Sequence, residues 1–331
     1  MTWEMIKMIK SAIKEYIFPA DSVTKSCHAS TVLPLEDGTV LAAWFGGKSE
    51  KDKSVEIYVS VRSALGVWSA PFAVSENNDI PHWNPVLYQN EDGGITLFYK
   101  LGKEIEDWIT KYIKSYDGGK TWSAPKELVP GDVSGGRGPV KNKCIKTSKG
   151  VLLAPASTEQ KNKWLPFIDI SYDDGKTWVK TPEMERAKYK GANVHLIQPS
   201  LWEDKDGLIH CFMRSDKGAV YRSDSSDGGT TWKKPYRTSL PNNNSGLDCC
   251  TDSAGRIWLI YNPVSVNWGV RHPLSLAFSN DNGKKFTEIL LPEAGNGEFS
   301  YPAIVYKDGA LHITYTHKRK QIVYWKILLE E

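Results

Sequence analysis

Two arginines and two histidines stand out because the two pairs have nearly the same spacing. The interval from Arg214 to Arg271 is almost the same as the interval from His28 to His82. A guanidinium binds a carboxylate through paired hydrogen bonds, and an imidazole acts as acid or base near neutral pH. If these spacings reflect a structural repeat, each pair occupies equivalent places on neighbouring units. We therefore expect a carboxylate-binding site. We expect no metal site, because the two histidines lack a third close ligand.

The meaning of these spacings depends on an octapeptide that recurs along the chain. Its aromatic ends follow one another at an almost constant interval. Full copies are Ser115–Trp122, Ser171–Trp178, Ser225–Trp232 and Ser279–Phe286, and a degenerate copy without the aspartate ends at Trp68. In each full copy the aspartate carboxylate accepts hydrogen bonds from turn amides, and glycine supplies a positive φ. Each octapeptide therefore predicts a hairpin turn with a structural role.

Between the turns lie alternating or apolar runs typical of strands, about four in each repeat. Examples are residues 39–44, 56–62, 95–100, 151–154, 208–213, 257–261 and 310–316. A regular period of this length, with four strands in each unit, predicts a β-propeller. The markers give five blades, and residues 287–331 supply most of a sixth. We predict an all-β, six-bladed propeller over residues 26–331, with residues 1–25 packing on it and closing the ring.

The composition excludes several classes of protein. The 331 residues include 42 Lys and Arg against 39 Asp and Glu, a net charge of +3, which does not suggest a nucleic-acid partner. The one short basic cluster, His317–Lys320, is typical of a solvated turn. No apolar stretch approaches the ~20 residues of a membrane span, so we expect no membrane partner. Nothing in the sequence specifies an oligomeric state.

The N-terminal segment and the cysteines indicate the cellular compartment in which the protein is expected. Charged residues interrupt the segment Met1–Phe18, so we expect no signal peptide there; Met5, Ile6, Ile9 and Ile13 at helical spacing favour a short amphipathic helix. The five cysteines lack CxxC spacing and are odd in number, which argues against a disulfide framework or a zinc site. We expect a reduced, cytoplasmic protein.

The repeat resembles that of the sialidase superfamily, whose members are six-bladed propellers carrying this Asp-box turn. It is most similar to bacterial BNR-repeat proteins commonly labelled predicted neuraminidases. Five segments carry the resemblance: Cys27–Thr31, Ala43–Gly47, Pro139–Lys143, Asn244–Asp248 and Ser300–Ala303. Sialidases hold the substrate carboxylate with three arginines, and use an aspartate as acid and base and a tyrosine nucleophile helped by a glutamate. The resemblance implies that Arg214 and Arg271 bind the carboxylate, Asp52 is the acid and Tyr301 the nucleophile.

Two positions depart from the family pattern. His28 stands where the first arginine is expected, and Gln198 stands where the glutamate is expected. These changes favour a lyase over a true sialidase. In that alternative the arginines neutralise a uronate carboxylate, and His28 or Tyr301 removes the neighbouring proton as a base.

Further residues are expected around the mouth of the central funnel, because they begin or end strands at corresponding blade positions. They are Lys141, Asn142, Lys143, Glu159, Gln198, Asn244 and Asp248. Trp83, beside His82, is expected to stack on a sugar ring. The leading hypothesis is an exo-acting glycoside hydrolase that removes a terminal acidic sugar, with no cofactor. The alternatives are a uronate lyase and a non-catalytic glycan-binding propeller.

Overall fold

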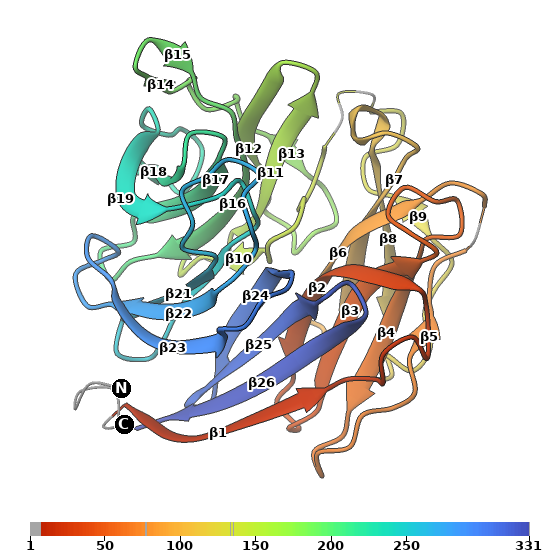
Figure 1. Cartoon of the computed structure of the whole chain (residues 1–331). Coiled ribbons are helices and arrows are strands. Elements are labelled where there is room, and N and C mark those ends of the chain that lie inside the picture. The colour runs from red at the N-terminus through yellow and green to blue at the C-terminus, as the bar shows by residue number, and fades with distance from the viewer. Residues whose placement is uncertain (1–7, 77, 133, 135, 331) are drawn as a thin grey trace.

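The computed structural model describes residues 8–330 except 77, 133 and 135, and this part of the chain forms six four-stranded antiparallel sheets around a central axis (Figure 1). Blades 1 to 3 comprise β2 (Ser26–Pro34), β3 (Val40–Gly47), β4 (Glu56–Arg62) and β5 (Phe72–Ala73); β6 (His82–Gln89), β7 (Ile95–Leu101), β8 (Ile109–Ser115) and β9 (Lys126–Glu127); and β10 (Ile145–Lys146), β11 (Leu152–Gln160), β12 (Lys163–Ser171) and β13 (Val179–Lys180). Blades 4 to 6 comprise β16 (Leu196–Glu203), β17 (Ile209–Ser215), β18 (Ala219–Ser225) and β19 (Tyr236–Pro241); β20 (Asp248–Thr251), β21 (Ile257–Tyr261), β22 (Leu274–Ser279) and β23 (Thr287–Glu293); and β24 (Phe299–Lys307), β25 (Ala310–His317), β26 (Gln321–Leu329) and β1 (Ile9–Tyr16). The predicted all-β, six-bladed propeller is confirmed.

Both ends of the chain build the sixth blade. Strand β1 pairs antiparallel with β26, so the outermost strand of this blade comes from the N-terminal segment (Figure 1). Glu15 of β1 also accepts hydrogen bonds from Nε and Nη2 of Arg62 in blade 1, at 2.8 and 2.7 Å. The amphipathic helix expected here is wrong for residues 9–16, because pairing with a long neighbouring strand outweighs weak helical spacing. Met5 and Ile6 lie outside the described residues.

The octapeptides form turns between the third and fourth strands of blades 2 to 5. In the first, Oδ1 of Asp117 accepts the amides of Lys120 and Thr121 at 3.0 and 2.9 Å, and Oδ2 accepts the Thr121 hydroxyl at 2.6 Å. Gly119 has φ +86°, and a Cβ there would lie 2.4 Å from Leu41 of blade 1. The turn is therefore a scaffold element that also packs one blade on the next.

Apolar clusters fill the spaces between blades. One joins Trp44 of blade 1 to Tyr324 of blade 6 and includes Phe18, whose ring is stacked 4.9 Å from that of Trp44. Outside the blades, the structure has a two-stranded hairpin, β14 (Lys188–Tyr189) with β15 (Ala192–Asn193), and a short 3-10 helix, η1 (Ile105–Asp107). In the described part of the chain no helix is long and apolar enough to cross a membrane.

The innermost strands of four blades share a bulge that turns side chains toward the axis. Their pairing shifts register after His28, Trp83, Ile197 and Ser300. The next residue in each blade has a left-handed backbone: Ala29, Asn84, Gln198 and Tyr301, with φ of 56°, 42°, 55° and 51°. The residue equivalent to His28 is therefore Trp83, and the expectation that His82 matches His28 is wrong by one position.

Candidate active site

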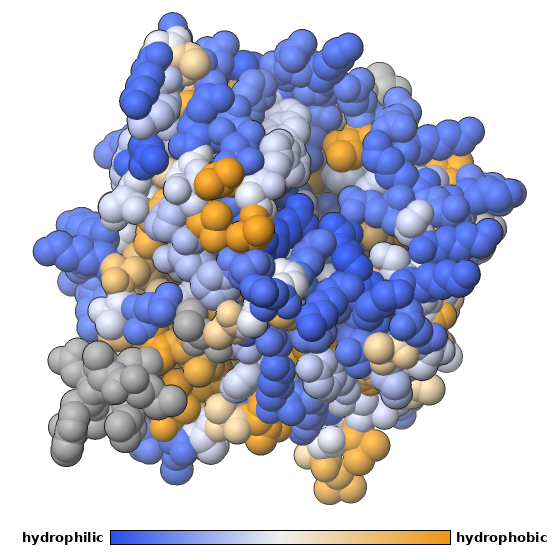
Figure 2. All heavy atoms as spheres, viewed as in Figure 1, coloured by the Kyte–Doolittle hydropathy of each residue, from blue (hydrophilic) through white to orange (hydrophobic). Residues whose placement is uncertain are grey.

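A cavity of about 230 Å³ lies at the centre of the propeller, and all six blades contribute to its wall. Its lining residues are His28, Glu50, Trp83, Asn84, Ile105, Trp108, Glu159, Trp164, Ile197, Gln198, Arg214, Trp268, Arg271, Tyr301 and Arg319. Each comes either from the bulge of an inner strand or from the second and third strands of a blade and their connection. Hydrophilic side chains gather near the centre of the face seen in Figure 2, with a small hydrophobic group beside them.

Three arginines from consecutive blades line this cavity. Arg214 lies on β17, Arg271 precedes β22, and Arg319 lies in the turn between β25 and β26. Arg271 and Arg319 both donate to Oε1 of Glu298, at 2.8 and 2.7 Å. Although burial opposes it, the charges of Arg319 and Arg271 hold the pKa of Glu298 below its usual value. The three guanidinium groups thus concentrate positive charge on this side of the cavity, and Glu298 balances part of it.

Tyr301 stands at the centre of this cationic wall. Its phenolic oxygen accepts a 2.7 Å hydrogen bond from Nη1 of Arg214, and the same nitrogen donates to Oε1 of Gln198 at 3.2 Å. The guanidinium carbons of Arg271 and Arg214 lie 5.5 and 5.7 Å from the tyrosine ring centre. Behind the ring, a Cβ at Gly246 would sit 3.3 Å from its atoms, so glycine allows the close approach. These contacts fix the oxygen and place positive charge beside it.

His28 packs against Tyr301, with 4.2 Å between the ring centres. Its Nδ1 lies 2.9 Å from the Thr316 hydroxyl. Burial lowers the pKa of His28 well below its usual value, and the nearby charges of Arg319 and Arg271 act in the same direction. Burial and these charges favour the neutral imidazole, so the cations of the cavity wall are Arg214, Arg271 and Arg319.

Asp52, which the resemblance implies to be the acid, lies in a loop beside the cavity. Asp52 does not line the cavity; its Oδ1 accepts the amide of Ser54 at 2.9 Å in the loop between β3 and β4. The carboxyl groups that reach the cavity wall among the described residues are Glu50, from the same loop, and Glu159, from the end of β11. Oε2 of Glu50 accepts a 2.7 Å hydrogen bond from Nη1 of Arg319.

With the fold and site described, comparison with known proteins gives the family. A model of the BNR repeat-like domain matches residues 38–313. The chain belongs to this family.

Solved structures resemble this BNR propeller throughout its length. A protein of unknown function from Dyadobacter fermentans has a TM-score of 0.76 at 15% identity, covering 97% of this chain and 100% of that one. Hadza microbial sialidase Hz136 has a TM-score of 0.78 at 16% identity, with 95% and 68% covered. A Trypanosoma rangeli sialidase in complex with sialic acid has a TM-score of 0.74 at 17% identity, and its matched part covers 97% of this chain and 59% of its own length. The predicted likeness to sialidases is confirmed for the fold.

Five polar residues expected at the mouth lie behind the wall of the BNR propeller instead. Lys141 donates to the carbonyls of Leu247 and Pro302, which ties blade 3 to blades 5 and 6. The other four are Asn142, Lys143, Asn244 and Asp248. Lys143 forms a 3.0 Å ion pair with Asp248, and Asn244 accepts a 3.0 Å hydrogen bond from Nε of Arg214. They join blades or orient Arg214, because inner strands also face one another across the axis.

His82 is buried away from the cavity, where its Nδ1 lies 3.0 Å from the Ser75 hydroxyl. Trp83 does line the cavity wall, and its Nε1 donates to the carbonyl of Gly102 at 2.9 Å. In the described residues, no group of three or more His, Cys, Asp or Glu side chains is arranged to hold a metal ion.

The sequence interpretation missed the part of the cavity wall that comes from the connections between the second and third strands of the blades. Arg319 belongs to the basic cluster His317–Lys320, which the sequence predicts to be a solvated turn. In the structure it is the third arginine of the cavity wall. Trp108, Trp164 and Trp268 form the aromatic rim, and the rings of Trp164 and Trp268 lie 6.4 Å apart, edge to face. The signal available in the sequence was position: each follows the second strand of its blade, as Arg271 does.

Proposed function

We propose that this BNR propeller removes a terminal carboxylate-bearing sugar from a glycan by hydrolysis. The observation that carries the proposal is the convergence of Arg214, Arg271 and Arg319 around Tyr301 in one cavity. Guanidinium groups bind carboxylates in fixed geometry through charge-assisted hydrogen bonds, which neutral sugars do not offer. The likeness to sialidase structures supports the same class of substrate.

In the proposed reaction the arginines hold the sugar carboxylate and so orient its anomeric carbon toward Tyr301. A tyrosine oxygen suits this task, because an anionic carboxylate nucleophile would be repelled by the substrate carboxylate. Nη1 of Arg214 donates to that oxygen at 2.7 Å, which stabilises the negative charge that develops as the oxygen loses its proton. Gln198 and Asn244 hold Arg214 in place for this role.

The test is incubation with sialosides, Kdo-glycosides and uronate-terminated oligosaccharides, with products identified by mass spectrometry. Hydrolysis gives two products whose summed mass exceeds the substrate by one water. Retention of the wild-type rate in Arg214→Lys would overturn the assignment of the site, because lysine has one nitrogen and cannot donate from one nitrogen to Asn244 and from another to Tyr301. A binding signal without any product would replace the hydrolase with a glycan-binding propeller.

A second candidate, elimination at a uronate, is favoured by one observation: the neutral imidazole of His28 lies against Tyr301, while Gln198 occupies the place expected for glutamate. A neutral imidazole can accept the proton that an arginine-neutralised carboxylate acidifies. The same incubation separates the two reactions. Elimination adds no water and leaves an unsaturated sugar that absorbs ultraviolet light.

A further inference from the structure

Hydrolysis and elimination both require a proton on the departing oxygen, and Asp52, expected to supply it, is not in the cavity wall. Two carboxyl groups of the described chain do line that wall, Glu50 and Glu159. Their surroundings differ in charge, burial and place on the ring, and these differences decide between them.

Glu50 is already occupied as a counter-ion. Its Oε2 lies 2.7 Å from Nη1 of Arg319, and its side chain is 42% exposed. A guanidinium at this distance forms a charge-assisted hydrogen bond with the carboxylate. Glu50 is therefore suited to holding Arg319 in the carboxylate clamp.

Glu159 has the environment of a proton donor. Its Oε1 accepts a 2.7 Å hydrogen bond from the Ser157 hydroxyl, and it forms no ion pair with a cation in the described part of the chain. Burial raises the pKa of Glu159; the Ser157 hydrogen bond and the charges of Arg214 and Lys100 oppose this rise without cancelling it. A carboxyl group whose pKa is raised keeps its proton to higher pH than an ordinary glutamate, which favours the role of general acid.

The place of Glu159 on the ring also fits. The arginines stand on blades 4, 5 and 6, and Glu159 stands on blade 3, opposite Tyr301 of blade 6 in a ring of six blades. A sugar whose carboxylate is held by blades 4 to 6 points its other substituents toward blades 1 to 3. His28 stands on blade 1, and the arginines of the wall stand on blades 4 to 6. A proton donor on blade 3 faces that cationic wall.

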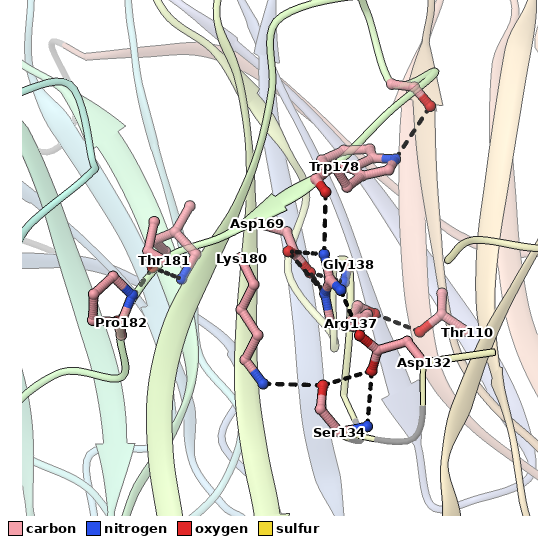
Figure 3. A network of polar contacts seen from close by, with 12 residues as sticks. Thr110, Asp132, Ser134, Arg137, Gly138, Asp169, Trp178, Lys180, Thr181 and Pro182 are labelled. Atoms are coloured by element: carbon pink, nitrogen blue, oxygen red, sulfur yellow. Dashed lines mark hydrogen bonds and ion pairs between the residues drawn. The ribbon is translucent and has the colours of Figure 1, made fainter. Parts of the chain in front are cut away.

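Beside the strand that carries Glu159, a buried polar network joins Arg137 to Asp169 of β12, the strand that pairs with β11 (Figure 3). Arg137 donates from Nε to both oxygens of Asp169 at 3.0 Å and from Nη1 to Asp132 at 2.7 Å. These bonds anchor the segment that contains Gly136, where φ is +75° and a Cβ would lie 2.3 Å from the carbonyl oxygen of Ser157. The segment thus rests on the backbone of the residue whose hydroxyl orients Glu159.

We propose that Glu159 is the catalytic residue that protonates the departing glycosidic oxygen; the inference rests on the proposed function and applies to either reaction. The O–H bond of Glu159 breaks as its proton passes to the bridging oxygen. The bond between that oxygen and the carbon that it leaves breaks at the same time, and its electron pair stays on the oxygen. The carboxylate that remains is stabilised by the Ser157 hydroxyl and by the charges of Arg214 and Lys100.

The experiment compares Glu159→Gln with Glu50→Gln and Asp52→Asn on two substrates of the same acidic sugar. One is a glycan with an alkyl leaving group, and the other is an umbelliferyl glycoside, whose acidic leaving group needs no proton. Glutamine keeps the acceptor for Ser157, so thermal melting is expected to show a folded protein. We expect Glu159→Gln to lose about 100- to 10,000-fold in kcat on the glycan and far less on the aryl substrate. The fall in rate at alkaline pH should also disappear.

An equal loss on both substrates would overturn the proposal, since it would make Glu159 a positioning residue. A loss dependent on the leaving group in Glu50→Gln or Asp52→Asn, but not in Glu159→Gln, would overturn it in favour of that residue. If the wild-type protein forms no product from any substrate, the proposed function fails and the role of Glu159 fails with it. Wild-type activity with an unaffected Glu159→Gln variant rejects the role of Glu159 alone.

Discussion

Nη1 of Arg214 donates a 2.7 Å hydrogen bond to the phenolic oxygen of Tyr301, across two blades that are not neighbours in the ring. The backbone positions of the two residues bring their side chains together. Tyr301 follows the inner-strand bulge of blade 6 with φ 51°, and Arg214 lies on the second strand of blade 4, one residue from its end. A left-handed tyrosine is strained by the order of 1–3 kcal/mol. The surrounding propeller maintains this backbone conformation, and the conformation places the tyrosine oxygen in the cavity.

Tyr301→Phe tests whether this oxygen takes part in the reaction. Removing it leaves the packing against His28 and Gly246 intact, so we expect a nearly unchanged melting temperature and a fall in kcat of about 100-fold or more. Steady-state kinetics on the active substrate measure the change. Tyr306→Phe is the matched control, because its hydroxyl contacts Ser253 outside the cavity at 2.8 Å. Full turnover in Tyr301→Phe would remove the oxygen from the mechanism.

Arg319→Ala tests the third cation of the clamp. We expect affinity for a carboxylated sugar to fall about 10- to 100-fold, because a charge-assisted hydrogen bond contributes about 1.5–3 kcal/mol. Affinity for the methyl ester of the same sugar should change little. Calorimetry measures both. Lys320→Ala removes the same charge from the adjacent residue, which pairs with Asp21 at 2.7 Å outside the cavity, and should leave binding intact. Equal losses for acid and ester would contradict carboxylate recognition by Arg319.

Asp248→Ala tests whether Asp248 stabilises the fold or contacts the ligand. Asp248 pairs with Lys143 at 3.0 Å and accepts the amide of Ile304 at 2.9 Å, so it ties blades 3, 5 and 6 together. Because the variant leaves the largely buried ammonium of Lys143 without a counter-ion, we expect the free energy of unfolding to fall by about 3 kcal/mol. Urea titration measures it. Glu36→Ala, at an exposed 3.8 Å pair with Lys307, should cost under about 1 kcal/mol. A stable Asp248→Ala protein with weakened glycan binding would restore the ligand-contact role predicted from sequence.

The repeat predicted the propeller, because a turn that recurs at constant spacing leaves little freedom in how its strands are paired. The same regularity predicted the cavity residues that lie on strands, such as Arg214 and Gln198. It failed by one residue at His82, because the bulges of blades 1 and 2 follow His28 and Trp83, which lie one residue further apart than Trp68 and Trp122 of the turns.

The connections could not be predicted in the same way. Their lengths differ between blades, so the period does not fix where a loop side chain points. Arg319 sits in a run of charged residues that resembles a solvated turn, yet Glu298 and Glu50 hold it over the cavity. In the loop that contains Glu50 and Asp52, local hydrogen bonds decide which acid turns inward: the Asp52 amide donates to the Ser49 carbonyl at 3.1 Å, and its carboxylate faces Ser54.

Two buried histidines outside the cavity predict an acid-sensitive fold. Burial lowers the pKa of His82 and of His312 to about 4. Between pH 6.5 and 4 the unfolded chain binds more protons at these residues than the folded chain, so stability falls as pH falls. At pH 5 each residue should remove about 2 kcal/mol from the free energy of unfolding relative to pH 7. Urea titrations of His82→Gln at the two pH values should therefore show a smaller difference than wild type. His312→Gln should reduce the difference by a similar amount. An unchanged difference in His82→Gln would show that other groups govern the acid sensitivity.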